Sequence, residues 1–181
     1  MRIVAGAWRG RTLSAPPGTV TRPTADRVRQ ALFDSLMHAP WAGRAKLEGA
    51  VVLDVFAGTG AMGLEALSRG AARAVFVEQD RAALSALRAN IAACRAEDCC
   101  SVLAIDAMRV PHGEAATLVF LDPPYGKGLV PLALDRLRAA GRIATGALVV
   151  AETGRDEPPL PVEALAERMH GAARIAVWRH A

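Results

Sequence analysis

The chain has 181 residues, of which 52% are hydrophobic and 22% charged, and its formal net charge is +4. This composition is that of one globular domain with a proper core, and no apolar run reaches the ~20 residues of a membrane span, so membrane-spanning and disordered classes are excluded. The first residues, MRIVAGAWRGR, lack the continuous apolar stretch of a signal peptide, which predicts a cytoplasmic protein. Cys94, Cys99 and Cys100 show no CxxC spacing, so no metal site is expected.

The positive charge is concentrated near the N-terminus. Residues 1–46 carry eight basic and two acidic side chains, a net charge of +6, which leaves −2 for residues 47–181. Arginine binds phosphate through a two-pronged fork, so a basic arm on a near-neutral body predicts a polyanionic partner. The alternative is that a GC-rich genome prefers arginine to lysine, which explains the ratio of the two residues but not their clustering.

The arm is predicted to hold a small hairpin and a helix. Two short strands, residues 2–5 and 11–14, flank a turn at Gly6 and Gly10. A loop follows, and Thr24 is a plausible N-cap for a helix over residues 25–37. Its apolar positions share one face, with the arginines elsewhere: Val28, Ala31, Leu32 and Leu36.

From residue 50 onwards strand and helix patterns alternate, with strands that are apolar on both faces. This pattern predicts a mostly parallel, doubly wound α/β sheet covered by helices. The tail is expected to form an antiparallel hairpin that turns near His170 and Gly171. The expected strands are 51–56, 74–78, 101–106, 117–122 and 147–152, and the expected helices are 61–68, 81–94 and 129–140.

The segment VLDVFAGTGAMG follows the first of these strands and opens the next helix. Its glycines fit G-x-G-x-x-G, and Glu78 lies 20 residues after the first of them at the end of the next strand. Glycines let the backbone turn sharply beside a ligand, and a carboxylate at the second strand end accepts hydrogen bonds from ribose hydroxyls. The loop therefore predicts a nucleoside-bearing cofactor, held by Gly58, Gly60 and Gly63.

Asp54, four residues before the first glycine, separates two candidate cofactors. The pyrophosphate of NAD would be repelled by this carboxylate, whereas the sulfonium and α-amino group of S-adenosylmethionine would be attracted. The alternative is that Asp54 caps the amides of its own loop. Asp106, at the predicted end of the third strand, would face the adenine through its carboxylate or a neighbouring amide; a solvated turn is nearly as plausible for it.

The segment DPPY, Asp122 to Tyr125, ends the fourth strand at the same edge of the sheet. An exocyclic amine of a nucleobase is a poor nucleophile, because its lone pair is delocalised into the ring. The Asp122 carboxylate and the Pro123 carbonyl can accept its N–H groups and orient the lone pair, and the Pro123-Pro124 turn is rigid. Tyr125 offers a face on which a flipped base stacks. A simple strand-ending turn explains the prolines but not the flanking Asp and Tyr.

Four segments together resemble the bacterial family that methylates N2 of a guanine in small-subunit (16S) ribosomal RNA. They are RIVAGAWRGRTL…RPTADRVRQALFDSL, LDVFAGTGAMGLEALSRGA, FVEQD and DPPY, and the match runs from residue 2 to about 126 and more loosely to the end. The glycine loop and DPPY mark amino-methyltransferases broadly, including those acting on DNA adenine. The N-terminal G-x-W-R-G-R and RPT-x-DRVR segments narrow the choice.

The resemblance implies a Rossmann-like class I methyltransferase that uses S-adenosylmethionine and no metal. It implies catalytic roles for Asp122, Pro123, Pro124 and Tyr125. With their immediate neighbours, the family's motif positions give an expected set of cofactor contacts: Asp54, Phe56, Gly58, Gly60, Glu78, Gln79, Asp106, Ala107 and Asp122.

By the same resemblance, residues 1–46 form an RNA-binding arm on a methyltransferase domain of residues 47–181. The expected partner is 16S rRNA in an assembling 30S subunit, and the expected state is a monomer. Closing a small hydrophobic cluster is an equal alternative for Trp8. Four residues of the arm are expected to line the substrate side of the cofactor pocket, with surface solvation as the alternative for Arg29: Arg22, Thr24, Arg27 and Arg29. The rival functions are a DNA adenine-N6 methyltransferase and a cofactor- and RNA-binding module without chemistry. The expected RNA contacts are Trp8, Arg9, Arg11, Arg22, Thr24 and Arg27.

Overall fold

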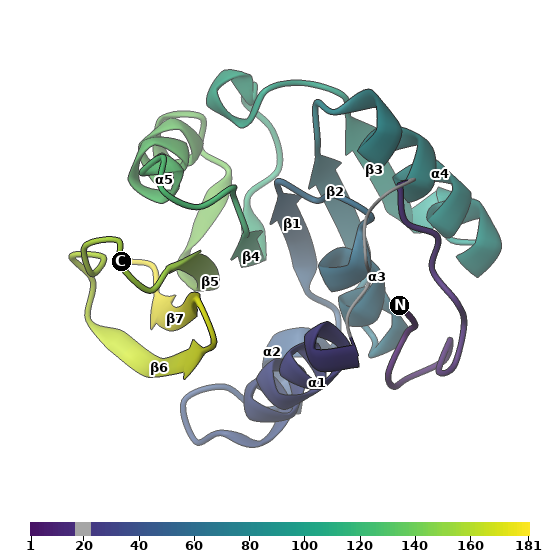
Figure 1. Cartoon of the computed structure of the whole chain (residues 1–181), viewed down its shortest axis with the longest axis horizontal. Coiled ribbons are helices and arrows are strands. Elements are labelled where there is room, and N and C mark those ends of the chain that lie inside the picture. The colour runs from purple at the N-terminus through teal and green to yellow at the C-terminus, as the bar shows by residue number, and fades with distance from the viewer. Residues whose placement is uncertain (17–22) are drawn as a thin grey trace.

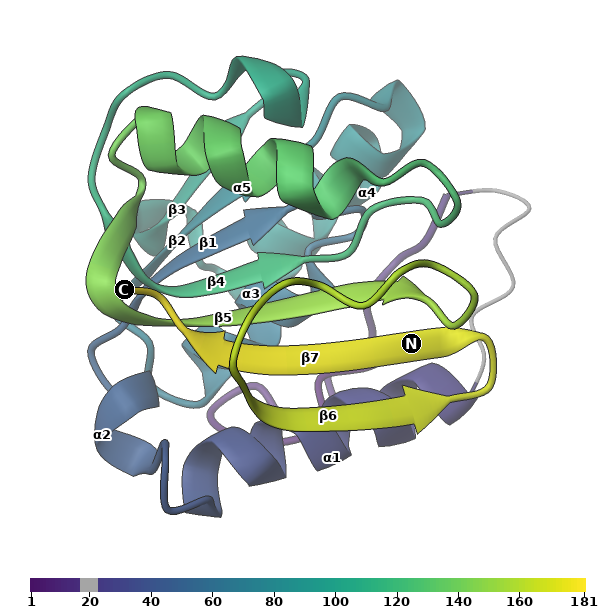
Figure 2. The ribbon, with the colours of Figure 1, turned by 90° about the vertical axis from the view of Figure 1, so that its left-hand side faces the viewer.

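A seven-stranded sheet lies between two layers of helices in the computed structural model, which describes residues 1–16 and 23–181 (Figures 1 and 2). The strands are β1 (Val51–Val55), β2 (Arg73–Val77), β3 (Cys100–Leu103), β4 (Ala116–Leu121), β5 (Ile143–Gly154), β6 (Ala164–His170) and β7 (Ala173–Arg179). The helices are α1 (Pro23–His38), α2 (Arg44–Leu47), α3 (Ala61–Ser68), α4 (Arg81–Cys94) and α5 (Leu129–Ala139).

The strand order is β3-β2-β1-β4-β5-β7-β6. The strands from β3 to β5 pair in parallel, and β7 pairs antiparallel with both β5 and β6. This arrangement confirms the predicted doubly wound sheet and its C-terminal hairpin. The chain order reverses between β1 and β4, and the crevice at such a switch point is where open α/β sheets bind ligands.

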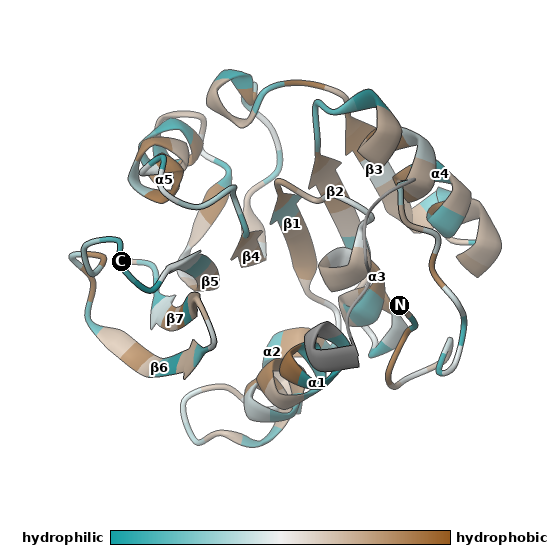
Figure 3. Cartoon of the chain, viewed as in Figure 1, coloured by the Kyte–Doolittle hydropathy of each residue, from teal (hydrophilic) through white to brown (hydrophobic). Residues whose placement is uncertain are grey.

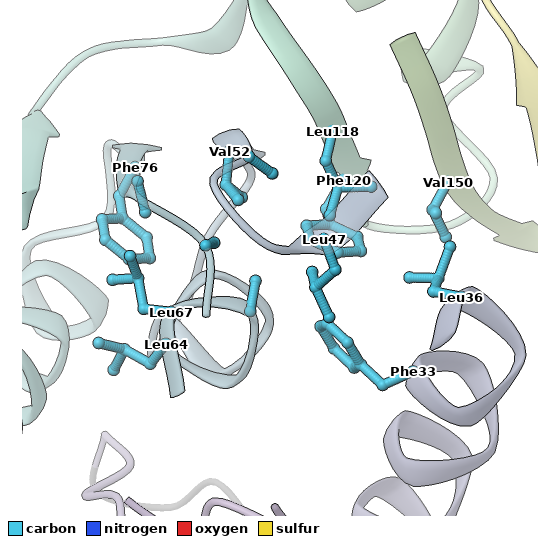
Figure 4. Packing of buried hydrophobic residues seen from close by; sticks show 14 of the residues in the cluster. Phe33, Leu36, Leu47, Val52, Leu64, Leu67, Phe76, Leu118, Phe120 and Val150 are labelled. Atoms are coloured by element: carbon cyan, nitrogen blue, oxygen red, sulfur yellow. The ribbon is translucent and has the colours of Figure 1, made fainter. Parts of the chain in front are cut away.

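Alternate residues of β1 to β5 and of β7 enter one of two hydrophobic clusters, one on each face of the sheet. On the first face, Val52, Phe120 and Val150 pack with α1, α2, α3 and α4 (Figure 4). On the second face, Val55, Leu121 and their neighbours pack against α5. The central strands are accordingly hydrophobic along their length, as their colouring shows (Figure 3). This two-sided burial is why the strands lack a polar alternation in the sequence.

The N-terminal arm folds as a tight hairpin docked on α3. The two predicted strands are reduced to one bridge, Arg2 with Thr12, because the Gly6 to Gly10 turn takes up most of the segment. A Cβ at Gly6 would lie 1.8 Å from the Ser68 carbonyl oxygen, and its φ is +82°. Only glycine therefore allows the arm to approach α3 this closely.

Helix α1 packs on the sheet through Phe33, whose ring centroid lies 5.6 Å from that of Phe120. The predicted apolar face is largely confirmed, since Leu32 and Leu36 are buried, but Phe33 is buried as well. The prediction that the arginines point away from the core is wrong for Arg29, which is 5% exposed. The helix begins at Pro23, so Thr24 lies inside it rather than at its cap.

Three further elements differ from prediction. The short helix α2 lies between the predicted helix of residues 25–37 and the predicted strand of residues 51–56, where no element was predicted, and its Leu47 is buried. Strand β3 ends at Leu103, short of Asp106, because the Asp106 side chain accepts from the Met108 N–H and begins a 3-10 turn, Ala107–Arg109. Strand β5 begins earlier than expected, at Ile143. Within residues 1–16 and 23–181, no helix is long and apolar enough to cross a membrane.

Candidate active site

Two cavities open at the carboxyl ends of the parallel strands. The first measures about 510 Å³ and the second about 610 Å³, and both volumes lie in the range of about 300–1,000 Å³ common for small-molecule sites. Phe56, Asp122 and Tyr125 line both cavities. The first cavity is also lined by Val77, Glu78, Gln79, Asp80, Ile105, Ala107, Pro123, Pro124, Lys127 and Leu129. The second cavity also touches the glycine loop, Asp54, α1, Glu152 and the turn between β6 and β7.

The glycine loop is held by Glu78. One carboxylate oxygen of Glu78 accepts from the Gly58 N–H at 2.8 Å, and the other accepts from the N–H groups of Gln79 and Asp80. A Cβ at Gly58 would meet no atom within 4 Å, and this residue lines the second cavity with φ +54°. A ligand can therefore approach the loop backbone here. Glu78 also lines the first cavity, so it holds the loop while it faces a ligand.

Phe56 joins the two cavities in a backbone conformation that is unusual for a phenylalanine. Its φ is +63°, in the left-handed region that side chains with a Cβ rarely adopt. Such conformations cost on the order of 1–3 kcal/mol and cluster at ligand sites. Phe56 directly follows β1, so the turn presents this residue to both cavities at the switch point of the sheet.

Asp54 is a buried carboxyl group that faces the second cavity from β1. Its Oδ2 accepts from the Gly63 N–H at 2.9 Å, which is the loop-capping contact considered from the sequence. Burial raises the pKa of Asp54 to about 8; the Gly63 N–H lowers it, and the carboxylates of Asp122 and Glu78 raise it. A cationic ligand group beside Asp54 would favour its ionised form. This carboxyl group therefore suits a sulfonium or an ammonium.

The DPPY segment is tied to its neighbouring strands. The Asp122 N–H donates to the Val55 carbonyl at 3.4 Å, and the Tyr125 hydroxyl donates to Glu152, near the end of β5. Just beyond, one oxygen of Glu157 accepts from the Gly126 N–H at 2.8 Å and from the Gly154 N–H at 2.9 Å. These contacts fix a segment that would otherwise be a surface loop.

Glu152 and Glu157 are site residues that the sequence analysis missed. Glu157 has no signal that a single sequence shows, because its partners are backbone groups distant in the chain. Glu152 did have one: it ends the strand segment ALVVAE as Asp122 ends TLVFLD. Equal placement at two neighbouring strand ends brings their side chains together.

Charge accumulates around Asp122. Burial and the Glu152 carboxylate, in that order, raise the pKa of Asp122 to about 7. Asp122 as a residue is solvent-exposed, so we give the repulsion from Glu152 the greater weight. Burial and the hydrogen bond to Glu152 also raise the pKa of the Tyr125 hydroxyl above its usual range. The hydroxyl therefore stays protonated and donates to Glu152.

Of the remaining predicted cofactor residues, Gly60 lines neither cavity: it is buried, and a Cβ there would lie 2.3 Å from the Leu87 Cδ1. The others lie in or next to the first cavity. Gln79 is exposed and lines it, and so does Ala107. The Asp106 carboxylate accepts from the Met108 N–H at 2.9 Å, and its neighbour Ile105 lines the cavity. This wall of the cavity is mostly apolar.

The predicted RNA contacts lie outside these cavities in the described part of the chain. Arg9, Arg11 and Arg27 are exposed on the arm. Trp8 packs partly buried against the core, which agrees with the alternative of a hydrophobic cluster, and its backbone N–H donates to the Ser68 Oγ at 3.0 Å. Arg22 and the side chain of Thr24 lie outside the described residues. The arm contributes other side chains to the second cavity: Met1, Val28, Arg29 and Leu32.

Glu65 holds this part of the arm in place. Its carboxylate is fully buried and accepts from the Val4 N–H at 2.8 Å, the Ala5 N–H at 3.0 Å and the Arg69 Nε at 2.8 Å. The Arg29 Nε lies 3.6 Å from it, and the same guanidinium donates to Asp26 at 2.9 Å and to the Arg2 carbonyl. The ion cluster thus sets the wall of the second cavity that faces the strand ends.

The family model described as conserved hypothetical protein 95 matches residues 1–179. The chain belongs to this family. Ribosomal RNA small subunit methyltransferase D of Escherichia coli is 38% identical to it, over 97% of this chain and 87% of the relative. The protein of the same name from Haemophilus influenzae is 34% identical, over 90% and 83%. These findings confirm the family resemblance drawn from the motifs.

Solved structures show the same fold. That of the methyltransferase yhhF from Escherichia coli has a TM-score of 0.85 at 36% identity, covering 99% of this chain and 97% of that one. The RNA methyltransferase from Salinibacter ruber, in complex with S-adenosyl-L-homocysteine, has a TM-score of 0.61 at 19% identity, covering 88% and 93%. The family member therefore has the class I methyltransferase fold predicted from its sequence.

Proposed function

We propose that this family member transfers a methyl group from S-adenosylmethionine to N2 of a guanine in small-subunit ribosomal RNA. It is an S-adenosylmethionine-dependent methyltransferase, like the relatives named above. The observation that carries the proposal is the position of Asp122 and Tyr125, which line both the cavity beside Glu78 and the cavity beneath the N-terminal arm. Two ligands can therefore meet at these residues.

The described residues fit the proposed cofactor. S-adenosylmethionine supplies an electrophilic methyl group on a sulfonium. Glu78 and the loop at Gly58 would hold its ribose and the adjoining chain, and Ile105 and Ala107 would flank the adenine. Asp54 would lie next to the positive charge of the cofactor. The carboxyl group is buried, and no cation is among the groups that shift its pKa, so the cofactor would supply its cationic partner. Phe56 and Gln79 would line the same path, and Asp106 would shape it through its turn.

DPPY would orient the amine. The Asp122 carboxylate and the Pro123 carbonyl accept its two N–H groups, which aims the nitrogen lone pair away from the ring plane. Pro123 and Pro124 keep the carbonyl fixed, and Tyr125, which is 43% exposed, offers its ring face to the base. No metal is needed for this reaction, since in-line displacement at a methyl group requires only position and an acceptor for the proton.

The basic arm would bind the RNA. Residues 1–46 act with the domain of residues 47–181, and their net charge of +6 suits a phosphate backbone. The proposed contacts are Trp8, Arg9, Arg11, Arg22, Thr24 and Arg27. We further propose a monomer that acts in the cytoplasm on an assembling 30S subunit.

The test is transfer of labelled methyl groups from S-adenosylmethionine to 16S rRNA, and to 30S particles that lack this methylation, followed by nucleoside analysis. The expected product is N2-methylguanosine at one nucleotide. Label in N6-methyladenosine would refute the guanine assignment, and label in DNA alone would refute the RNA assignment. Greater transfer to naked rRNA than to 30S particles would refute the assembling subunit as substrate.

A further inference from the structure

Glu152 and Asp122 occupy equivalent positions on neighbouring parallel strands. In the register of β4 and β5, Phe120 pairs with Val150 and Leu121 with Ala151. Asp122 and Glu152 come next on each strand, so they share the face of Phe120, on which α1 and α3 pack. Neighbouring strands lie about 4.8 Å apart. Two carboxylates thus stand side by side in the second cavity, which both residues line.

The pair faces a cavity that contains little to neutralise it. The Tyr125 hydroxyl donates to Glu152, and Arg29 and His170 are the basic side chains that also line this cavity in the described part of the chain. Arg29 is engaged by Asp26 and Glu65. Like charges this close are unfavourable until hydrogen-bond donors lie between them. The cavity is therefore suited to a ligand edge that carries adjacent N–H groups.

Guanine has such an edge, and adenine does not. The Watson–Crick edge of guanine presents the N1–H beside the N2 amino group, so two adjacent positions donate. The corresponding edge of adenine presents an amino group beside an unprotonated N1, which a carboxylate would repel. One carboxylate can accept a hydrogen bond from the amino group of either base. A second carboxylate beside it favours guanine, because only guanine has an N1–H to donate to it.

We propose that Glu152 accepts a hydrogen bond from N1–H of the target guanine while Asp122 holds its N2 amine, so that Glu152 determines specificity for guanine. The inference rests on the proposed function and adds the residue that selects the base. Tyr125 has a second role in it, because its hydroxyl fixes the Glu152 carboxylate while its ring faces the base. The raised pKa of Asp122 is consistent with this, since a donor edge would relieve its repulsion with Glu152.

The test uses 2-aminopurine, which keeps the N2 amine but has an unprotonated N1. Full-length 16S rRNA is ligated with guanosine or 2-aminopurine riboside at the methylated nucleotide, and kcat/KM is measured for both. The wild-type enzyme should prefer guanine by about 100-fold or more, because a site built for a donor rejects an analogue that lacks it. Glu152→Gln offers an amide N–H to the bare N1 and should reduce the preference below about tenfold.

Two controls separate the possible failures. Glu163→Gln removes an exposed carboxylate and should keep the wild-type preference. Cofactor affinity and thermal unfolding of Glu152→Gln, measured in parallel, show whether it is folded. An unchanged preference in folded Glu152→Gln, or a wild-type enzyme that treats the two bases alike, would overturn the inference and leave the proposed function standing. Absence of N2-methylguanosine with the wild-type enzyme and guanosine RNA would overturn both.

Discussion

Glu65 and the Asp122–Glu152 pair are carboxylates on the same side of the sheet with opposite surroundings. Glu65 is fully buried and accepts from two backbone N–H groups and from Arg69. Asp122 and Glu152 face a cavity and repel each other, and the Tyr125 hydroxyl donates to Glu152. Donors of the protein itself satisfy Glu65, which holds the N-terminal arm in place, whereas Asp122 and Glu152 face the cavity and are available to a ligand.

This difference separates stability from activity. Glu65 is fully buried, and a buried charge without a partner costs several kcal/mol. Asp122 is exposed and Glu152 is half-buried, so the cost of placing them side by side is their mutual repulsion, which raises the pKa of Asp122. Carboxyl groups perturbed in this way mark functional sites. Substitutions at Asp122 should change catalysis, and substitutions at Glu65 should change folding.

The largest effect is expected for Asp122→Asn. The amide keeps one acceptor but adds a donor that opposes the amine, so kcat should fall by about 10²–10⁴-fold, the range for loss of a positioned acceptor and base. The free energy of unfolding should stay the same or rise, because the repulsion with Glu152 is removed. Single-turnover methyl transfer and urea denaturation measure the two quantities. A loss of stability together with the loss of activity would show that Asp122, like Glu65, stabilises the fold.

The next effect is expected for Glu65→Gln. The variant leaves Arg69 and Arg29 without their buried partner, so the free energy of unfolding should drop by about 3–5 kcal/mol. Glu48→Gln is the matched control, since its pair with Arg44 spans 3.5 Å and is exposed, and its loss should cost less than about 1 kcal/mol. Urea denaturation of both variants measures this. Equal losses would show that the Glu65 cluster does not anchor the arm.

A pH dependence of activity follows from the raised pKa of Asp122. Below its pKa the carboxyl holds a proton and loses an acceptor, so kcat/KM should fall about tenfold per pH unit below pH about 7. Removal of the neighbouring charge in Glu152→Gln should move this inflection to lower pH. Methyl transfer measured between pH about 5.5 and 8.5 gives both profiles. Coincident profiles would show that the two carboxylates do not interact.

A smaller effect is expected for the pH dependence of stability. The folded Asp54 keeps its proton up to pH about 8, whereas the unfolded residue releases it near 3.8. The folded state thus binds more protons between these values, and its stability falls as pH rises, by at most about 1.4 kcal/mol per unit. Asp54→Asn should lose this contribution to the slope in urea denaturation at pH about 5.5 and 7.5, while the raised pKa of Asp122 leaves a smaller slope of the same sign below pH about 7. Equal pH slopes of stability for the wild type and Asp54→Asn would mean that Asp54 is ionised in the folded protein.

Much of the fold follows from local patterns. The bounds of α3 and α4 were predicted correctly. The apolar residues of each helix recur with helical spacing, and a short window of sequence is enough to show this pattern and the strand that follows it. The C-terminal hairpin also turns where expected, at Gly171. The glycine loop and Asp122 could be placed at one sheet edge, since the ends of parallel strands meet there.

The rest depends on contacts between distant segments. Arg29 was expected beside the cofactor pocket or, alternatively, at the surface; it lines the second cavity, and its burial beside Glu65, from another helix, was not foreseen. Glu152 ends a strand segment as Asp122 does, but the register of β4 and β5 is needed to show that the two residues are level. A single sequence does not give that register.

The most direct measurement is a crystal structure of the enzyme with S-adenosylhomocysteine and an RNA that contains the target guanine. We expect the base in the second cavity against Tyr125, with its N2 about 2.7–3.2 Å from Asp122 and its N1 at the same distance from Glu152. A base whose Watson–Crick edge faces Arg29, or one bound outside this cavity, would contradict it.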